Sequence, residues 1–283
     1  MQTDPFAKYD PEVLKTVRNM RLLDDDLMTK VFESTECVEL VLRLIMDVPT
    51  LKVVPTSRTQ DSLKNLQGKS VRFDVWAEDA SGAQYNIEVQ RADKGAGCKR
   101  ARYNSAILDS NIADPGDEYQ KLPQTYVIFI TERDVLKKGQ LCYRIKRMYW
   151  DESYSRYEEF KDEAHIIYVN ATHHDISTEL GKLMADFRAK DPEQMYFEPL
   201  KERVKYFKQE PEGVGSMCRA VEELQEKALN KGMDIGEEKG WLKGLCWAVY
   251  NRQTPLKDAI KASEKEESEF MEWMHKFYPD YKA

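Results

Sequence analysis

The sequence lacks the features that mark disulfide-rich, secreted and membrane-spanning proteins. No apolar run approaches the roughly 18–20 residues that span a bilayer, and the polar start MQTDPFAKYD has no signal-peptide core. The five cysteines are scattered along the chain without a CxxC pair, which argues against a disulfide framework and a thiolate zinc site. We therefore predict a soluble cytoplasmic protein with no membrane partner.

Acidic residues outnumber basic residues, and several common catalytic motifs are absent from the sequence. The chain has 43 Lys and Arg against 50 Asp and Glu, a net charge of −7 with a pI near 5.4, and this balance normally argues against nucleic acid as a partner. The four histidines show no HExxH or His/Cys ligand spacing, and neither GxSxG nor GxxxxGK(S/T) occurs. A histidine-bound metal, a GxSxG hydrolase and a P-loop are thus poorly supported.

Residues 71–91 (VRFDVWAEDASGAQYNIEVQR) carry the most informative pattern of the chain. Apolar and polar side chains alternate over 71–76 and again over 85–90, which is typical of two half-buried strands. The DASG sequence between them suits a three-residue loop at 80–82, closed by a glycine in the left-handed region. In that register Asp74 lies directly opposite Glu88.

Two opposed acids in a hairpin repel each other unless something compensates. Directly opposed Cβ atoms are roughly 4.5–5.5 Å apart, and like charges at that spacing destabilise a strand pair. A divalent cation with oxygen ligands would turn this repulsion into coordination, and Gln90 shares the strand face of Glu88. The alternative is a solvent-exposed polar face whose acids point at water.

The segment that follows, 91–103, is locally basic. Its five cations and one acid give a balance of plus four: Arg91, Lys94, Lys99, Arg100 and Arg102 against Asp93. Phosphate attraction depends on the patch at a cleft rather than on the charge of the whole chain. We therefore predict DNA binding that is weak and strongly salt-sensitive.

The remaining patterns of the first 210 residues predict an α/β fold. The run QTYVIFIT at 124–131 is continuously apolar and is typical of a central strand buried on both faces. Further strands are predicted at 141–150 and 164–170, and helices at 35–48 and 178–189. Together they predict a mixed sheet with helices on both sides.

The Asp74 hairpin, the NIEVQ strand and the following KRARY segment resemble the PD-(D/E)XK nuclease superfamily, in its Rpn-type branch of recombination-promoting nucleases and transposase-like proteins. The similarity covers residues 20–245 and includes ECVELVLRLI, HIIYVN and ELGKLMADF. It implies a restriction-endonuclease-like α/β fold and a Mg²⁺-dependent DNA endonuclease, with Mn²⁺ as a substitute, that serves recombination or mobile elements.

The resemblance also implies roles for individual residues. Asp74 and Glu88 would bind the metal, and Gln90, which stands where the superfamily name has Lys, would orient the attacking water. A neutral amide cannot replace the positive charge of that Lys. Glu39, within VELVL, matches a further acidic ligand of the superfamily, and its alternative is an ordinary solvated helix glutamate.

Four residues after the hairpin are predicted to contact DNA: Lys94, Arg100, Arg102 and Tyr103. One of the three cations would supply the charge that Gln90 lacks, and all three would hold backbone phosphates. The sequence leaves open which of them reaches the site. Tyr103 would stack on or hydrogen-bond the substrate, with simple packing as the alternative.

Three parts are predicted along the chain: a PD-(D/E)XK nuclease-like domain (1–210), a helical connector (211–245) and a small helical module (246–283). Glycines at 232, 236, 240 and 244 predict either a helix face for close packing, as in a homo-oligomer, or a broken linker. Two rival functions stay open. One is a catalytically inactive nuclease-fold DNA-binding or accessory protein, and the other is an oligomeric scaffold.

Overall fold

The computed structural model describes residues 5–55, 58–63, 71–91 and 95–281, and the chain divides into two units. Unit 1 is Met1–Ala220 and unit 2 is Val221–Ala283. The predicted domain boundaries at 210 and 245 stay predictions. Each unit has its own core.

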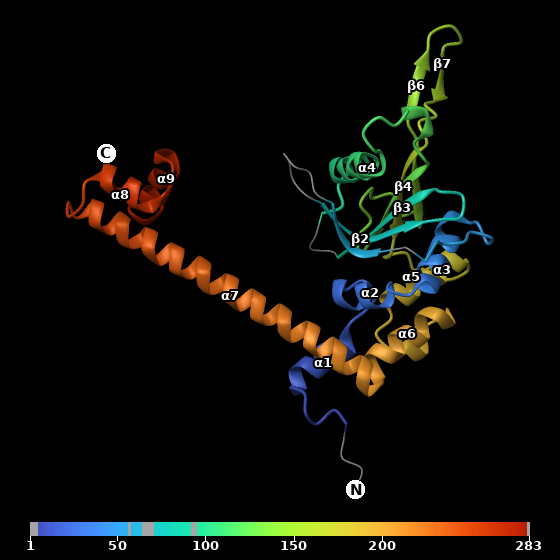
Figure 1. Cartoon of the computed structure of the whole chain (residues 1–283), viewed down its shortest axis with the longest axis horizontal. Coiled ribbons are helices and arrows are strands. Elements are labelled where there is room, and N and C mark those ends of the chain that lie inside the picture. Colours follow the sequence, from blue (N-terminus) through green and yellow to red (C-terminus); the bar gives the residue numbers. More distant parts are fainter. Residues whose placement is uncertain (1–4, 56–57, 64–70, 92–94, 282–283) are drawn as a thin grey trace. The chain divides into compact units, whose positions relative to one another are not determined.

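A mixed sheet of six strands, counted over the described residues, runs through unit 1 in the order β1-β2-β3-β4-β8-β5 (Figure 1). The strands are β1 (Arg58–Leu63), β2 (Val71–Glu78), β3 (Gln84–Gln90), β4 (Thr125–Thr131), β5 (Cys142–Ile145) and β8 (Ala164–Asn170). Strands β1 to β3 are antiparallel, β3, β4 and β8 are parallel, and β5 is antiparallel to β8. The predicted restriction-endonuclease-like α/β fold is confirmed.

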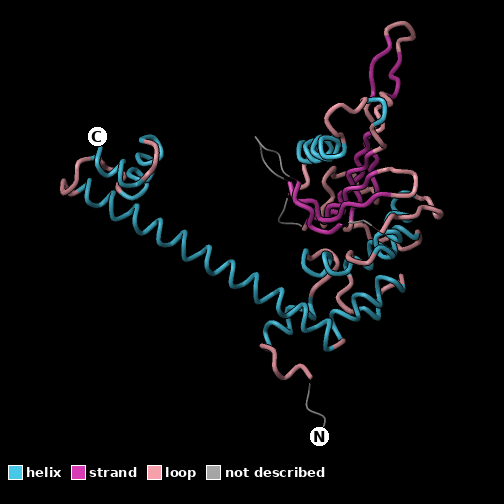
Figure 2. The backbone as a smooth tube through the Cα atoms, viewed as in Figure 1, coloured by secondary structure: helices cyan, strands magenta, loops and turns pink. Residues whose placement is uncertain are grey.

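Helices cover both faces of the sheet, as Figures 1 and 2 show. Helix α4 (Cys98–Ile112) packs on β4 and β8 from one side. On the other side lie α2 (Asp25–Val31), α3 (Thr35–Met46) and α5 (Glu179–Arg188), and α6 (Glu198–Gln209) packs on α2 and α3. Shorter elements complete the unit: α1 (Pro11–Asn19), η1 (Tyr119–Lys121) and η2 (Pro192–Gln194). The middle of the sheet is thereby buried: β3 is buried throughout and β4 along almost its whole length, as its apolar run predicts.

The strand predicted at 141–150 is wrong as a single element. It divides into β5 and β6 (Met148–Asp151), and β6 pairs with β7 (Arg156–Glu159) in a separate two-stranded hairpin. Strand β5 pairs with β8 only as far as Ile145, opposite Ile166. The chain then leaves the sheet, and its next backbone partners come from the following segment. Strand β1 was not predicted at all.

Unit 2 contains the later part of a long helix and two short helices: α7 (Pro211–Tyr250), α8 (Leu256–Ser263) and α9 (Glu267–Phe277). Helix α7 is continuous through the four spaced glycines, so the helical alternative is the one observed. A Cβ added to any of these glycines would meet no described atom within 4 Å. The predicted self-association of this region stays a prediction. Among the described residues, no helix is both long and apolar enough to cross a membrane.

Candidate active site

A tight turn between β2 and β3 sets the register of the hairpin. The backbone N–H of Asp79 donates to Ala83 O at 3.0 Å, and the N–H of Gly82 donates to Asp79 O at 2.9 Å. Gly82 has φ +86, in the left-handed region that favours glycine. The strands then pair from Glu78 with Gln84 back to Val75 with Ile87, so the predicted loop and register are confirmed.

The Asp79 side chain holds this turn together. It accepts hydrogen bonds from Ser81 N (2.8 Å), Ala83 N (3.1 Å) and the Tyr85 hydroxyl (2.7 Å). Burial raises the pKa of Asp79, but the hydrogen bonds from Ser81 and Tyr85 outweigh burial and hold the pKa below its ordinary value. The charged carboxylate is therefore the form that the folded protein prefers.

Replacing Asp79 by Ala is expected to lower the free energy of unfolding by about 2–3 kcal/mol at pH 7, because several donors of the turn lose their shared acceptor. A carboxyl whose pKa is lowered by folding stabilises the protein above its unfolded pKa and loses this effect on acidification. The difference from wild type should thus shrink below about pH 4. Urea unfolding at several pH values measures it, with the exposed Asp117→Ala as control. Equal stability of wild type and Asp79→Ala at pH 7 would contradict this account.

Asp74 and Glu88 occupy the next position of the hairpin after the last regular pair. There the Asp74 carboxylate accepts a hydrogen bond from the backbone N–H of Val89 at 2.9 Å, and this bond links the two strands where the regular ladder ends. Asp74 is half-buried, whereas the Glu88 side chain is fully buried at 0% exposure. The structure therefore brings these two predicted residues together.

Arg100 of α4 reaches back over the strand that carries Glu88 and Gln90. Its guanidinium donates to Glu88 Oε2 at 3.0 Å and to Gln90 Oε1 at 2.8 Å. A further bond to Gly95 O at 3.1 Å and the ring of Phe129, 5.9 Å from Cζ, hold it in place. Because the Arg100 side chain is 40% exposed, it lies between the buried Glu88 carboxylate and solvent.

The environment of Glu88 strongly disfavours its charge. Burial and the neighbouring Asp74 carboxylate raise the pKa of Glu88 to about 8. Arg100, the Asn86 amide and the backbone N–H of Asp74 act in the opposite direction and only partly offset this. Near neutral pH the free protein therefore holds a proton at this site, and a bound cation would have to displace it.

The donor set fits a hard divalent cation. Glu88 Oε1 is buried and has no hydrogen-bond partner among the described residues, although buried carboxylate oxygens are normally paired. The described residues contain no group of three His, Cys, Asp or Glu placed to hold a metal. Mg²⁺ is often bound by one or two carboxylates together with waters and substrate phosphate oxygens. Asp74 and Glu88 are sufficient for that mode of binding.

Glu39 is not brought together with these acids. It lies on α3, where its carboxylate accepts hydrogen bonds from Val53 N at 2.9 Å and from Lys52 Nζ at 3.2 Å and pairs with Arg43. Val53 in turn bridges to Asp79, at the turn end of the hairpin. Glu39 thus anchors the segment before β1 near that turn, several strand positions away from Asp74.

The other residues predicted to contact the substrate are Lys94, Arg102 and Tyr103. Lys94 lies outside the described residues. Arg102 is exposed on α4, and Tyr103 is half-buried against the hydrophobic cluster that includes Phe73 and Leu108. Among the described cations that the sequence predicts, Arg100 is thus the one that contacts Glu88 and Gln90.

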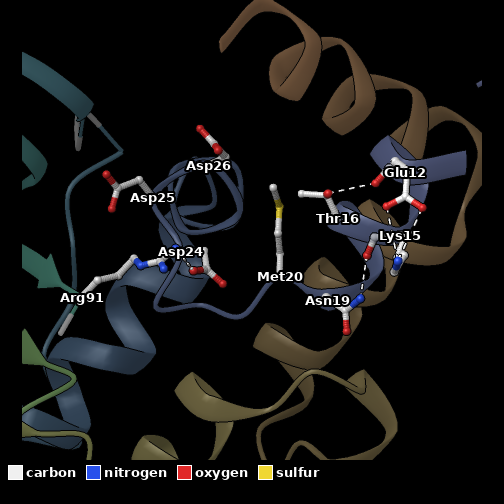
Figure 3. A pocket seen from close by; sticks show the side chains of 9 residues that line it. All are labelled: Glu12, Lys15, Thr16, Asn19, Met20, Asp24, Asp25, Asp26 and Arg91. Carbon is white, nitrogen blue, oxygen red and sulfur yellow. Dashed lines mark hydrogen bonds and ion pairs between the residues drawn. The ribbon is translucent and has the colours of Figure 1, made fainter. Parts of the chain in front are cut away.

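A surface pocket of about 620 Å³ lies beside Arg91, the residue that follows β3. Figure 3 shows the Arg91 guanidinium against Asp24, a contact of 2.8 Å, with side chains of α1 and α2 around it. Four acids line this pocket against two cations: Glu12, Asp24, Asp25 and Asp26 against Lys15 and Arg91. This excess of negative charge makes the pocket unfavourable for phosphate groups.

Two residues near the site were missed at the level of sequence. Asn86 and Asn104 are buried, and both have amide atoms without a hydrogen-bond partner. Strand alternation could have identified Asn86, because it is two residues from Glu88 and shares its face. No local signal marks Asn104, whose location depends on how α4 packs on the sheet.

Comparison with models of protein families gave a match. The family described as PD-(D/E)XK nuclease family transposase matches residues 47–208, more than half of the chain. The matched region contains the hairpin, α4 and the parallel strands β4 and β8. Comparisons with curated proteins and with solved structures found no match.

Proposed function

Because the chain belongs to the PD-(D/E)XK nuclease family transposases, we propose that it is a metal-dependent endonuclease that hydrolyses phosphodiester bonds in DNA. The observation that carries the proposal is the buried Glu88 carboxylate beside Asp74, with one oxygen unpaired and Arg100 bonded to the other. Asp74 and Glu88 would hold Mg²⁺ or Mn²⁺. We leave Glu39 out of the proposed ligand set, because its carboxylate accepts hydrogen bonds from Lys52 and Val53.

A bound divalent ion would polarise the scissile phosphate and lower the pKa of the attacking water. The protein groups around it orient the substrate. Arg100 donates a hydrogen bond to Gln90 Oε1. The amide NH₂ of Gln90 is then the group that would donate to water or to a phosphate oxygen. The Arg100 guanidinium, fixed by Gln90 and Glu88, supplies the positive charge that the superfamily places on Lys.

DNA backbone contacts would come from the exposed part of α4. Arg102 lies there, and Lys94 precedes the helix in sequence. The whole chain is acidic, so these contacts act locally and are sensitive to salt. Tyr103 contributes to packing in this account, because it lies against the cluster under α4.

The direct test is nicking of supercoiled plasmid by the purified chain with Mg²⁺, with Mn²⁺ and with EDTA. Metal-dependent nicking at low salt supports the proposal. A chain that binds plasmid without nicking it under any of these conditions contradicts the proposal and favours the second candidate, a non-catalytic DNA-binding or accessory protein. Gln90 in the place of Lys and the net charge of −7 favour that candidate.

Mn²⁺ affinity is expected to rise with pH, by up to about tenfold per unit between pH 6 and 8, and to level off above pH 8. The reason is that Glu88, with its pKa raised to about 8, must lose a proton before it binds a cation. Calorimetric titration in two buffers of different ionisation enthalpy measures both the affinity and the released proton. Glu88→Gln should remove the pH dependence. An affinity that is constant from pH 6 to 8 would contradict this role of Glu88.

A further inference from the structure

Between α4 and the sheet lie several buried polar atoms that have no hydrogen-bond partner among the described residues. These atoms are Nδ2 and Oδ1 of Asn86, Oε1 of Glu88, Nδ2 of Asn104 and the hydroxyl oxygen of Tyr168. None of these four side chains is more than 2% exposed. Native proteins pair nearly all such atoms, so several of them on one face require an explanation.

The strand register places Asn86 and Glu88 on this face. Both side chains point the same way because they are two residues apart on β3, and their neighbours on β4 are Val127 and Phe129. Val127 and Phe129 belong to the cluster that α4 covers. The Asn86 amide also lies close enough to Glu88 to favour the charged carboxylate, although neither amide atom makes a well-aligned hydrogen bond to a described residue.

The helix places Asn104 over the same face. Asn104 is one turn beyond Arg100, and it is buried on the side of α4 that carries Ala101 and Leu108. Arg100 marks where this side of the helix begins to meet β3, because it bonds Glu88 and Gln90. Asn104 is therefore a second polar side chain on this side of α4, one turn after Arg100 and buried in the interior.

Water is the ligand that suits these groups. An internal water makes two to four hydrogen bonds to buried polar groups, whereas empty cavities are lined by apolar side chains. An Asn side chain can both donate to a water and accept from it, and a carboxylate oxygen has two lone pairs. Glu88 Oε1 can therefore face a cation on its outer side and a water on its inner side.

We infer that Asn86 and Asn104 hold internal water against Glu88 Oε1, and that this hydrated layer positions the Glu88 carboxylate to bind metal. The inference rests on the proposed function, since it takes Glu88 as a metal ligand. Asn86 and Asn104 are then positioning residues, and they act through Glu88. Groups that orient a metal ligand in this way are commonly worth about 10–100-fold in metal affinity.

The test uses Asn86→Leu and Asn104→Leu, which keep the branched shape of the side chain and remove its polar atoms. Mn²⁺ is the probe, titrated calorimetrically into the full chain. We expect the Mn²⁺ dissociation constant to rise about tenfold or more in each variant. The midpoint of thermal unfolding should stay the same or rise, because apolar groups replace unpaired polar ones. Asn111→Leu, an exposed site on the same helix, is the control and should bind Mn²⁺ as wild type does.

Wild-type Mn²⁺ affinity in both Leu variants would overturn the inference, as would a lower unfolding midpoint with unchanged affinity, which indicates a structural role alone. Both results leave the proposed function standing if Glu88→Gln weakens Mn²⁺ binding and removes its pH dependence. Unchanged Mn²⁺ binding by Glu88→Gln would instead overturn the proposed metal site. If a Leu variant does not fold, the wild-type chain still decides the question. Nuclear Overhauser contacts between long-lived water and both Asn side-chain amides support the inference, and their absence contradicts it.

Discussion

Plasmid nicking by Glu88→Gln is expected to fall by about 10³-fold or more relative to wild type. The substitution removes the negative charge and one oxygen ligand from a side chain that is fully buried at the centre of the site. Asp74→Asn should have a similar effect, while its amide oxygen can still accept the hydrogen bond from Val89 N. The measurement is the initial rate of supercoil loss at saturating Mn²⁺.

Folding has to be separated from catalysis in these variants. Glu88→Gln should be at least as stable as wild type, because the folded protein disfavours a charge at this position. Glu78→Gln, on the same hairpin but at its turn end, is the matched control and should nick at the wild-type rate. Nicking that persists in the Glu88 and Asp74 variants would place the reaction at another site or in a contaminating enzyme.

Arg100→Met is expected to lower the nicking rate by about 10²–10³-fold, the range seen when one charge-stabilising donor is removed from an active site. The guanidinium bonds both Glu88 and Gln90, so its loss removes the cation of the site and frees the Gln90 amide to rotate. Arg100→Lys should be faster than Arg100→Met but slower than wild type. Lysine restores the positive charge but not the planar guanidinium that donates to two acceptors at once. Single-turnover nicking at saturating protein separates this effect from DNA affinity.

Arg102→Met is the control for general loss of positive charge on α4. Arg102 is exposed on the same helix, so its removal should weaken DNA binding modestly and reduce the salt dependence without a large change in the single-turnover rate. Equal losses of rate in the Arg100 and Arg102 variants would show that Arg100 acts only as one more phosphate contact. A wild-type rate for Arg100→Met would exclude its proposed catalytic role.

Sequence reasoning was most accurate where structure depends on residues near in the chain. The loop at 80–82 and the hairpin register follow from the DASG turn and from alternation, and both are confirmed. The central strand at 124–131 follows from a run of apolar residues that only a buried strand accommodates. The strand predicted at 141–150 failed because its apolar pattern says nothing about where pairing with β8 stops.

The acid pair of the site was accessible to sequence reasoning, whereas its cation was not. Alternation and turn length put Asp74 and Glu88 on one face before any tertiary contact is known. To choose Arg100 among the cations of 91–103, one must know which side of helix α4 faces strand β3. The rotation of α4 about its axis is set by the packing of residues such as Ala101 and Leu108 against β4 and β8.

The sequence by itself therefore determined the hairpin, its register and the opposed acids, because turns and strand alternation are local properties of the chain. Only the tertiary structure decided that Arg100 bonds Glu88 and Gln90, that Glu39 is engaged elsewhere, and that Asn86 of β3 and Asn104 of α4 are buried between the helix and the sheet. Each of these depends on how separate elements dock. Docking is governed by the summed packing of many distant side chains, which no short stretch of sequence encodes.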